Sequence, residues 1–256
     1  MTASEIRATA RKSLIGKWGK AALLTLTYVI ITFVINFVAN LIPIVGSLIV
    51  LVISTPISYG LIVTFMKLKR DEDVSYTDFL TNGFSAFGKV WGVVGNIILK
   101  MILPVCLVVI SIVLIMIGTG GAIFGAVVSS TSSSAATGAV AGFGILVVIG
   151  IILYVVSTIY TIIKGFLYSL SLYILNDNPD MSGKEIVTKS EELMTGNRWR
   201  YFWLSLTFIG WSILSIFTFG IGMLWLMPYI MIAMICFYEH LSGKLEANTT
   251  EFKTEE

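Results

Sequence analysis

The chain has 256 residues, of which 56% are hydrophobic and only 12% are charged, and its mean hydropathy is +0.91. Soluble domains average about 45–50% apolar and about 25% charged residues, so this composition argues against a soluble protein. The net charge of +2 gives no indication of a nucleic-acid partner. We therefore expect a membrane protein whose first partner is the lipid bilayer.

The basic residues are unevenly distributed along the chain. All 17 Lys and Arg residues fall within 7–20, 67–100, 164–200 or the C-terminal tail. Three other connections carry no charge: 41–47, 119–143 and 218–222. Cytoplasmic loops of membrane proteins are enriched in Lys and Arg, so the basic regions and both termini are predicted to be cytoplasmic.

Between the basic regions lie apolar runs long enough to cross a bilayer, which takes about 20 residues per helix. Backbone groups cannot stay unpaired in lipid, and the runs are too long for barrel strands, so they are predicted to be helices. The fold class expected is an all-α polytopic membrane protein with six transmembrane helices arranged as three hairpins. The six runs are Ala21–Ile42, Ser47–Met66, Val90–Ile117, Gly144–Ile163 with an extension to Leu175, Trp199–Thr218, and Met223–His240.

A short cytoplasmic pattern precedes each predicted hairpin. Thr2 to Glu5, Ser75 to Asp78 and Ser182 to Glu185 all read hydroxyl-x-x-acid, the capping box of a helix start. A glycine follows each acid after 11, 10 and 11 residues, and a tryptophan follows just before the span. Three copies in the same order indicate an internal repeat.

Apolar residues recur at helical spacing in each of these segments, for example Ile6, Ala10 and Leu14 in the first. We therefore expect each hairpin to be preceded by a cytoplasmic amphipathic helix lying on the inner leaflet. Residues 1–245 are predicted to form a single membrane domain, with repeat units at about 1–70, 71–176 and 177–245. Residues 246–256 form a polar cytoplasmic tail, and the Ser/Thr-rich stretch 129–134 an outer linker.

No reaction motif is present in the sequence. His240 is the only histidine, and it has no Cys or carboxylate set at metal-ligand spacing. The apolar runs contain no internal Asp, which intramembrane hydrolysis would favour. We expect no enzyme, no catalytic residues, no cofactor and no metal.

Two lysines enter the predicted spans, Lys100 and Lys164. A lysine at the bilayer centre costs about 2.5–3.5 kcal/mol, so it normally faces a cavity or extends its ammonium to the interface. Two interpretations stay open for each: it extends to the interface, or it contacts an anionic headgroup or substrate.

The last 90 residues contain a set of short motifs: Tyr173–Pro179, Met194–Asn197, Phe208–Trp211, Thr218–Gly222, Pro228-Tyr229 and Phe237–Glu239. These segments resemble the bacterial integral membrane family catalogued as domain of unknown function 975. Arg11, Leu14, Gly16 and Trp18 are similar too, so the resemblance covers about residues 1–245. It departs at the long Ser/Thr loop and at Ile162–Gly165, where the family usually has isoleucine-proline-glycine. The resemblance implies a location in the bacterial cytoplasmic membrane and brings no activity or site residues.

Two function classes follow. The first is a non-enzymatic protein for transport or for handling lipids with anionic headgroups, in which Lys100 or Lys164 meets an anionic lipid or substrate. The alternative is an accessory or regulatory protein that docks a membrane-protein partner through its cytoplasmic amphipathic helices.

Overall fold

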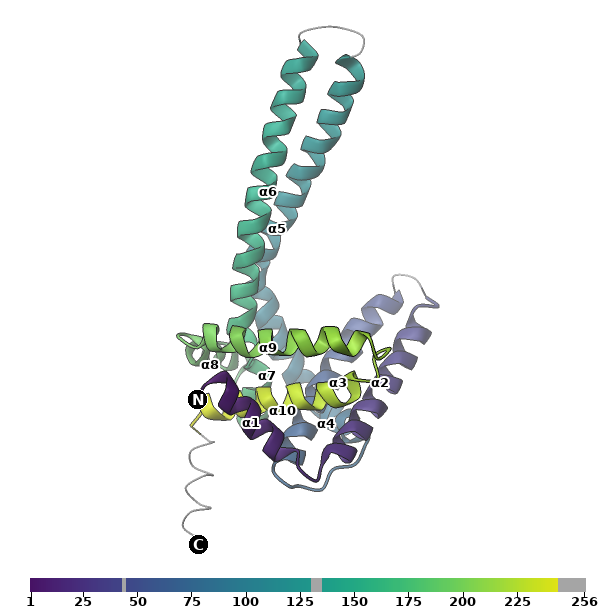
Figure 1. Ribbon diagram of the computed structural model, residues 1–256, viewed down its shortest axis with the longest axis vertical. Coiled ribbons are helices and arrows are strands. Elements are labelled where there is room, and N and C mark those ends of the chain that lie inside the picture. The colour runs from purple at the N-terminus through teal and green to yellow at the C-terminus, as the bar shows by residue number, and fades with distance from the viewer. Residues whose placement is uncertain (43–44, 130–134, 244–256) are drawn as a thin grey trace. The chain divides into compact units, whose positions relative to one another are not determined.

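A computed structural model describes residues 1–42, 45–129 and 135–243, and these residues are helical without any strand (Figure 1). The helices are α1 (Ala3–Ser13), α2 (Trp18–Ala39), α3 (Val45–Lys69), α4 (Asp78–Ser85), α5 (Phe87–Ser129), α6 (Ala135–Tyr168), α7 (Ser171–Asp177), α8 (Gly183–Met194), α9 (Arg198–Ile216) and α10 (Met223–Leu241). The predicted all-α class is confirmed.

Five helical stretches in the described part of the chain are long and apolar enough to cross a membrane: Trp18–Ala39, Val45–Lys69, Phe87–Val127, Gly142–Asp177 and Met223–Leu241. They are compatible with a multi-pass membrane protein. The run predicted at Trp199–Thr218 does form a helix, α9, but α9 is not among the five.

The predicted capping boxes are complete at two of the three helix starts. The Glu5 amide donates to the Thr2 hydroxyl at 3.4 Å, and the Thr2 amide donates to the Glu5 carboxylate at 2.7 Å. Ser182 and Glu185 make the same pair of bonds at 3.3 and 2.9 Å. The backbone hydrogen bond lowers the pKa of Glu5 and of Glu185 in each case.

The second start differs from the other two. The Ser75 amide donates to the Asp78 carboxylate at 2.8 Å, but α4 begins after Thr77, whose side chain makes no cap hydrogen bond. Gly16 and Gly196 adopt left-handed φ angles of 77° and 84° just after α1 and α8, whereas Gly88 lies inside α5. Glycine is the residue that most readily adopts the left-handed conformation at the end of a helix. The first and third segments therefore share a left-handed glycine after the helix, which the second lacks.

These caps lead to a first expected result. Replacing Ser182 with alanine removes the acceptor for the Glu185 amide and is expected to cost about 1 kcal/mol of stability. Thr77→Ala is the matched control, because the Thr77 side chain makes no cap hydrogen bond. Thermal unfolding of the two purified variants in detergent would measure the difference, and equal melting temperatures would contradict this role of the cap.

By contacts, the described residues form two compact units, one built from Met1–Asn96 with the chain from Leu167 onward, the other from Ile97–Phe166. The second unit contains most of the hairpin of α5 and α6, from Ile97 to Phe166. Its helices are longer than predicted, because the expected outer connection 119–143 is helical to Ser129 and again from Ala135. Residues 130–134 of the predicted linker lie outside the described residues.

Small residues explain why these two helices extend so far. A Cβ added to Gly118 would crowd Val147, one on Gly121 would crowd the Phe143 ring, and one on Gly150 would lie 2.8 Å from the Ile115 side chain. Glycines therefore let α5 and α6 approach closely enough for the apolar pairing to continue.

In the first unit α10 is the central helix. It contacts α1, α2, α3 and α9 and is buried over much of its length, including Ile232, Ala233, Ile235 and Phe237. The apolar residues of α1 (Ile6, Ala10, Leu14) and of α8 (Ile186, Val187, Met194) are also buried inside the chain. The apolar faces that sequence spacing assigned to the leaflet therefore pack on other helices.

Candidate functional site

The two lysines predicted as headgroup contacts lie in the hairpin of α5 and α6. Lys164 is half-buried, and its ammonium lies 5.9 Å from the centre of the Tyr160 ring, one helical turn earlier. Lys100 is also half-buried. Neither of them lines the cleft described below, so a headgroup contact at Lys100 or Lys164 stays a sequence-based prediction.

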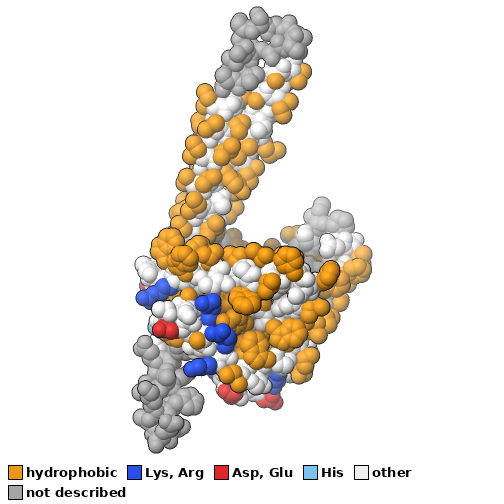
Figure 2. All heavy atoms as spheres, viewed as in Figure 1, with side chains coloured by type: hydrophobic (Ala, Val, Ile, Leu, Met, Phe, Trp, Pro, Cys, Tyr) orange, Lys and Arg blue, Asp and Glu red, His pale blue; other side chains and the backbone are white. Residues whose placement is uncertain are grey.

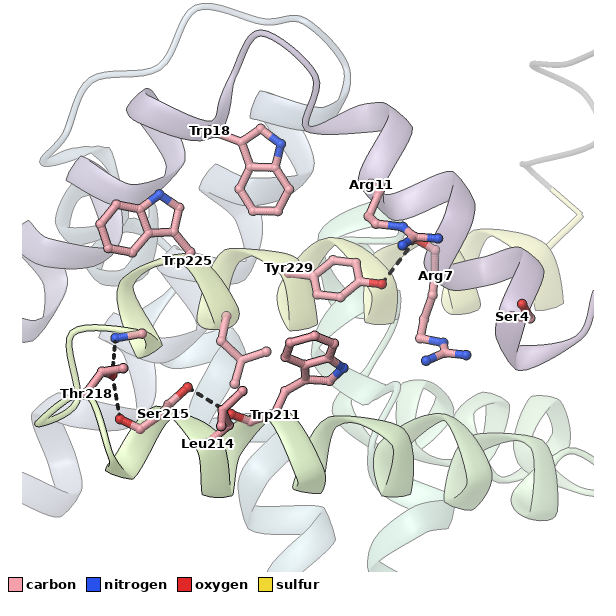
Figure 3. A pocket seen from close by; sticks show the side chains of 12 residues that line it. Ser4, Arg7, Arg11, Trp18, Trp211, Leu214, Ser215, Thr218, Trp225 and Tyr229 are labelled. Carbon is pink, nitrogen blue, oxygen red and sulfur yellow. Dashed lines mark hydrogen bonds between the residues drawn. The ribbon is translucent and has the colours of Figure 1, made fainter.

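The first unit contains a cleft of about 470 Å³ between α1, α9 and α10 (Figure 3). This volume lies within the range of about 300–1,000 Å³ that is typical of small-molecule sites. Its lining residues are Ser4, Arg7, Arg11, Trp18, Trp211, Leu214, Ser215, Thr218, Gly222, Trp225, Leu226 and Tyr229. The cleft therefore has two guanidinium groups and a largely aromatic and aliphatic wall.

Arg7 and Arg11 are four residues apart on α1, so they lie on one face of the helix. Arg7 is half-buried and Arg11 is exposed. The ion pairs found among the described residues join Lys17 to Asp71, Lys20 to Asp73, Lys69 to Glu239 and Arg70 to Asp177, and none of them includes Arg7 or Arg11. The two arginines thus bring positive charge to the cleft that no carboxylate in this part of the chain neutralises.

Aromatic side chains hold the middle of the cleft in place. Tyr229 of α10 lies with its ring centre 6.4 Å from that of Trp18 and 5.3 Å from that of Phe208. Its hydroxyl donates to the backbone carbonyl of Arg7 at 3.4 Å, as the dashed line in Figure 3 shows. Tyr229 therefore ties α10 to α1 at the level of the arginines.

The opposite end of the cleft has hydroxyl groups that are used for structure. Ser215 donates to the Trp211 carbonyl at 2.9 Å, and Thr218 donates to the Ser215 carbonyl at 2.8 Å and accepts from the Gly222 amide at 2.9 Å. These bonds build the turn between α9 and α10. The polar contacts left for a ligand are then concentrated at the arginine end.

A cluster of charges fixes the C-terminal end of α10. Glu239 pairs with Lys69 at the end of α3, and both side chains are buried. Asp177 accepts from Arg70 at 3.1 Å and from the Tyr238 hydroxyl at 2.9 Å. These carboxylates are satisfied within the chain, so we assign the cluster to holding α3, α7 and α10 together.

Sequence reasoning placed Arg7 and Arg11 on an inner-leaflet anchor and did not connect them to the last hairpin. The sequence does show which residues share one face of each helix that lines the cleft. The pairs four residues apart are Arg7 with Arg11, Trp225 with Tyr229, and Trp211 with Ser215. The sequence carries no signal that these three faces meet, because the contact depends on how α1 packs against α9 and α10.

Comparison with known proteins leaves this cleft without a characterised counterpart. No match was found among curated proteins or among solved structures. A protein family described as a protein of unknown function, DUF975, matches residues 1–245, which include all the lining residues. The resemblance that the sequence motifs indicated is confirmed: the chain belongs to the DUF975 family.

Proposed function

We propose that this chain is a non-enzymatic protein of the bacterial cytoplasmic membrane that binds an anionic amphiphile, such as a lipid with a phosphate headgroup, in the cleft. The observation that carries the proposal is a pair of guanidinium groups, which have no carboxylate partner among the residues that the structure describes, beside an aromatic and aliphatic wall. The pair complements the anionic headgroup, and the wall complements the hydrocarbon part.

The chemistry of arginine favours this class of ligand. A guanidinium group presents donors in a planar fork that matches phosphate or carboxylate oxygens, and two groups on one helix face can share one headgroup. The side chains of Leu214, Leu226 and Trp225 at the other end offer no charge and favour a hydrocarbon chain. A small soluble anion would use only the arginine end and would gain nothing from that wall.

The membrane arrangement that we propose has both termini in the cytoplasm. Lys17 at the start of α2 pairs with Asp71 after α3 at 2.6 Å, Arg70 pairs with Asp177 after α6, and Lys69 pairs with Glu239 near the end of α10. These contacts support an arrangement in which every hairpin begins and ends on the same side of the membrane. The basic residues of those regions support the cytoplasm as that side.

We also propose that the first and third sequence repeats, at about 1–70 and 177–245, descend from one repeated element. The matching capping boxes at Thr2 and Ser182 and the left-handed glycines Gly16 and Gly196 support this relation. The middle repeat, about 71–176, also begins with a short helix before a hairpin, but the start of that helix lacks the complete capping box.

Docking of a membrane-protein partner through the amphipathic helices is the alternative. The apolar side chains that such docking would use, Ile6, Ala10 and Leu14 in α1 and Ile186 and Val187 in α8, are buried within the chain. A partner would have to displace these contacts, so lipid binding in an open cleft is the better supported proposal.

The test compares two pairs of substitutions that remove the same charge. Arg7→Gln with Arg11→Gln removes both cleft cations, and Lys12→Gln with Lys184→Gln removes two exposed cations that do not line the cleft. Hydrogen bonds to charged groups contribute about 1.5–3 kcal/mol each, and about 1.4 kcal/mol is a factor of ten in affinity. We expect at least a tenfold loss of phosphatidylglycerol binding in the arginine variant and little change in the lysine control.

Binding would be measured by native mass spectrometry of the purified protein with phosphatidylglycerol and phosphatidylcholine, with inorganic phosphate as competitor. An equal loss in both variants would indicate general charge attraction, and displacement by inorganic phosphate would indicate a small-anion site; either result contradicts the proposal. Lys100→Gln with Lys164→Gln in the same assay tests the sequence-based candidates. We expect it to cost less than the arginine pair.

A further inference from the structure

We propose that the α9–α10 hairpin does not cross the bilayer. Its outer helix, α9, lies in the headgroup region of the cytoplasmic leaflet, and α10 is a core helix of the protein beneath it. The partner of the exposed α9 face is then the lipid surface itself. The inference concerns the hairpin's position and holds whichever ligand the cleft binds.

Helix α10 meets the hairpin of α2 and α3 at the start of α2 and the end of α3. The Lys17 ammonium donates to the Leu68 carbonyl at 3.0 Å, so the start of α2 and the end of α3 lie at one level. Tyr229 packs on Trp18 at this level, and Glu239 pairs with Lys69 at the same level.

Tyr229 and Glu239 are about 15 Å apart along a helix axis, at about 1.5 Å per residue. If α10 ran parallel to α2 and α3, the contact of Tyr229 and the contact of Glu239 would lie about 15 Å apart along those two helices. Instead α10 meets the cytoplasmic ends of both helices, so it runs across these ends. Figure 1 shows α10 running at an angle to α2 and α3.

The apolar composition of α10 is explained by contacts within the protein. Ile232, Ala233, Ile235 and Phe237 are fully buried. The helices that contact it are α1, α2, α3 and α9. An apolar helix surrounded by other helices needs no lipid to account for its composition.

Charged groups of α1 lie alongside α10. The N-terminal amine lies 2.7 Å from Nε2 of His240, and the Arg7 carbonyl accepts from Tyr229, so α1 lies along α10. If α10 crossed the bilayer with Leu241 at the inner boundary, Tyr229 would lie about 18 Å inside. Arg7 and Arg11 would then approach the centre of a core about 30 Å thick, at a cost of about 2.5–3.5 kcal/mol each.

The exposed surface of α9 is rich in aromatic and aliphatic side chains. Its exposed side chains include Trp199 (72% exposed), Trp203 (56%), Ile213 and Phe217 (78%), which share one face at helical spacing. Arg198 and Arg200 flank this face at its start. Figure 2 shows hydrophobic side chains following α9. Tryptophans beside arginines suit the headgroup region of an anionic leaflet, whereas α9 is not apolar enough for a span.

Together these observations place the cleft between α1, α9 and α10 at headgroup depth, with Arg7 and Arg11 beside the lipid phosphates. The helices left to cross the membrane are α2, α3, α5 and α6. Because α9 and α10 together make no crossing, the two termini stay on the same side.

Single cysteines test which side the turn between α9 and α10 faces. Phe219 is 98% exposed in that turn, Asn40 is exposed at the far end of α2, and Asp180 is exposed between α7 and α8. Cysteines at these positions would be introduced into a Cys106→Ser background; Cys236 is fully buried, and the parent protein checks that it does not react. The probe is a membrane-impermeant maleimide, applied to intact cells and to opened membranes.

We expect Asn40→Cys to react in intact cells, and Phe219→Cys and Asp180→Cys to react only in opened membranes. Reaction of Phe219→Cys in intact cells would show that the hairpin crosses, and would overturn the inference. The lipid-binding loss of the Arg7→Gln with Arg11→Gln variant does not depend on this outcome, so failure of one proposal is distinguishable from failure of the other.

Spin labels on α9 give a second measurement that needs no chemical access. Labels at Trp199→Cys, Ile209→Cys and Phe217→Cys are expected to report one shallow depth in vesicles containing phosphatidylglycerol. A crossing helix would instead place Ile209→Cys deepest. Labels shielded from both lipid-soluble and water-soluble relaxants would indicate that another protein chain covers α9, which also contradicts the inference.

Discussion

Removing the carboxylate of Glu239 is expected to destabilise the protein by about 3–5 kcal/mol, because Glu239→Ala leaves the buried ammonium of Lys69 without its partner. The side chains of Lys69 and Glu239 are only 10% and 3% exposed. An unpaired charge in that position loses its solvation by water, and no ion pair compensates for this loss. The size of the effect follows from burial, since exposed pairs contribute far less.

Two matched variants separate this explanation from a general loss of packing. Replacing both partners, Lys69→Met with Glu239→Leu, removes the unpaired charge and should recover most of the stability. Asp73→Asn breaks the pair between Asp73 and Lys20. Because the Asp73 carboxylate is fully exposed, this change should affect stability little. Thermal unfolding in detergent measures all three; a Glu239→Ala protein as stable as the parent would contradict the burial of the pair.

Alanine at Gly60 or Gly83 is expected to have a comparably large effect, because α3 and α4 pack backbone to backbone there. A Cβ on Gly60 would collide with the Phe79 carbonyl, and one on Gly83 with the Pro56 carbonyl. The two glycines face each other's helices reciprocally, so neither backbone can move without opening the other contact. Overpacking a well-packed site typically costs about 1–3 kcal/mol, and a clash with backbone belongs at the upper end.

The control for this prediction is Gly95→Ala in α5. Apart from its own stretch of helix, nothing lies within 4 Å of a Cβ added there, so alanine should be neutral or stabilise the helix by about 0.5–1 kcal/mol. Unfolding temperatures of Gly60→Ala, Gly83→Ala and Gly95→Ala would be compared. If Gly60→Ala and Gly83→Ala were as stable as Gly95→Ala, the close crossing of α3 and α4 would be wrong.

The local structure of this chain could be predicted where the determinants are local. The capping boxes at Thr2 and Ser182 and the left-handed Gly16 and Gly196 follow from neighbouring residues alone, and the structure contains them. The length of α5 and α6 could not be predicted in this way. The sequence predicts an outer connection at 119–143, but glycines such as Gly121 permit close packing of the two helices in that region.

The candidate site was missed for the same reason. Arg7 and Arg11 have the composition of an interfacial anchor, and only the packing of α1 against α10 brings them beside Trp18 and Tyr229. Hydrophobicity alone also leaves the position of α10 open, because a helix buried among other helices and a lipid-exposed helix have similar compositions. The burial of residues such as Ile232 and Phe237, and the contact of Glu239 with Lys69, are long-range properties that the sequence pattern does not reveal.

Binding of an anionic amphiphile in the cleft can be detected by photocrosslinking with a phosphatidic acid analogue that carries a diazirine in its acyl chain. Mass spectrometry of the crosslinked protein should find the lipid on cleft residues such as Leu214, Trp225 and Leu226, and the Arg7→Gln with Arg11→Gln variant should lose these crosslinks. A matching phosphatidylcholine analogue should label the cleft weakly. Crosslinks confined to the exposed faces of α2 and α3, or cleft labelling that is unchanged in the arginine variant, would contradict the account.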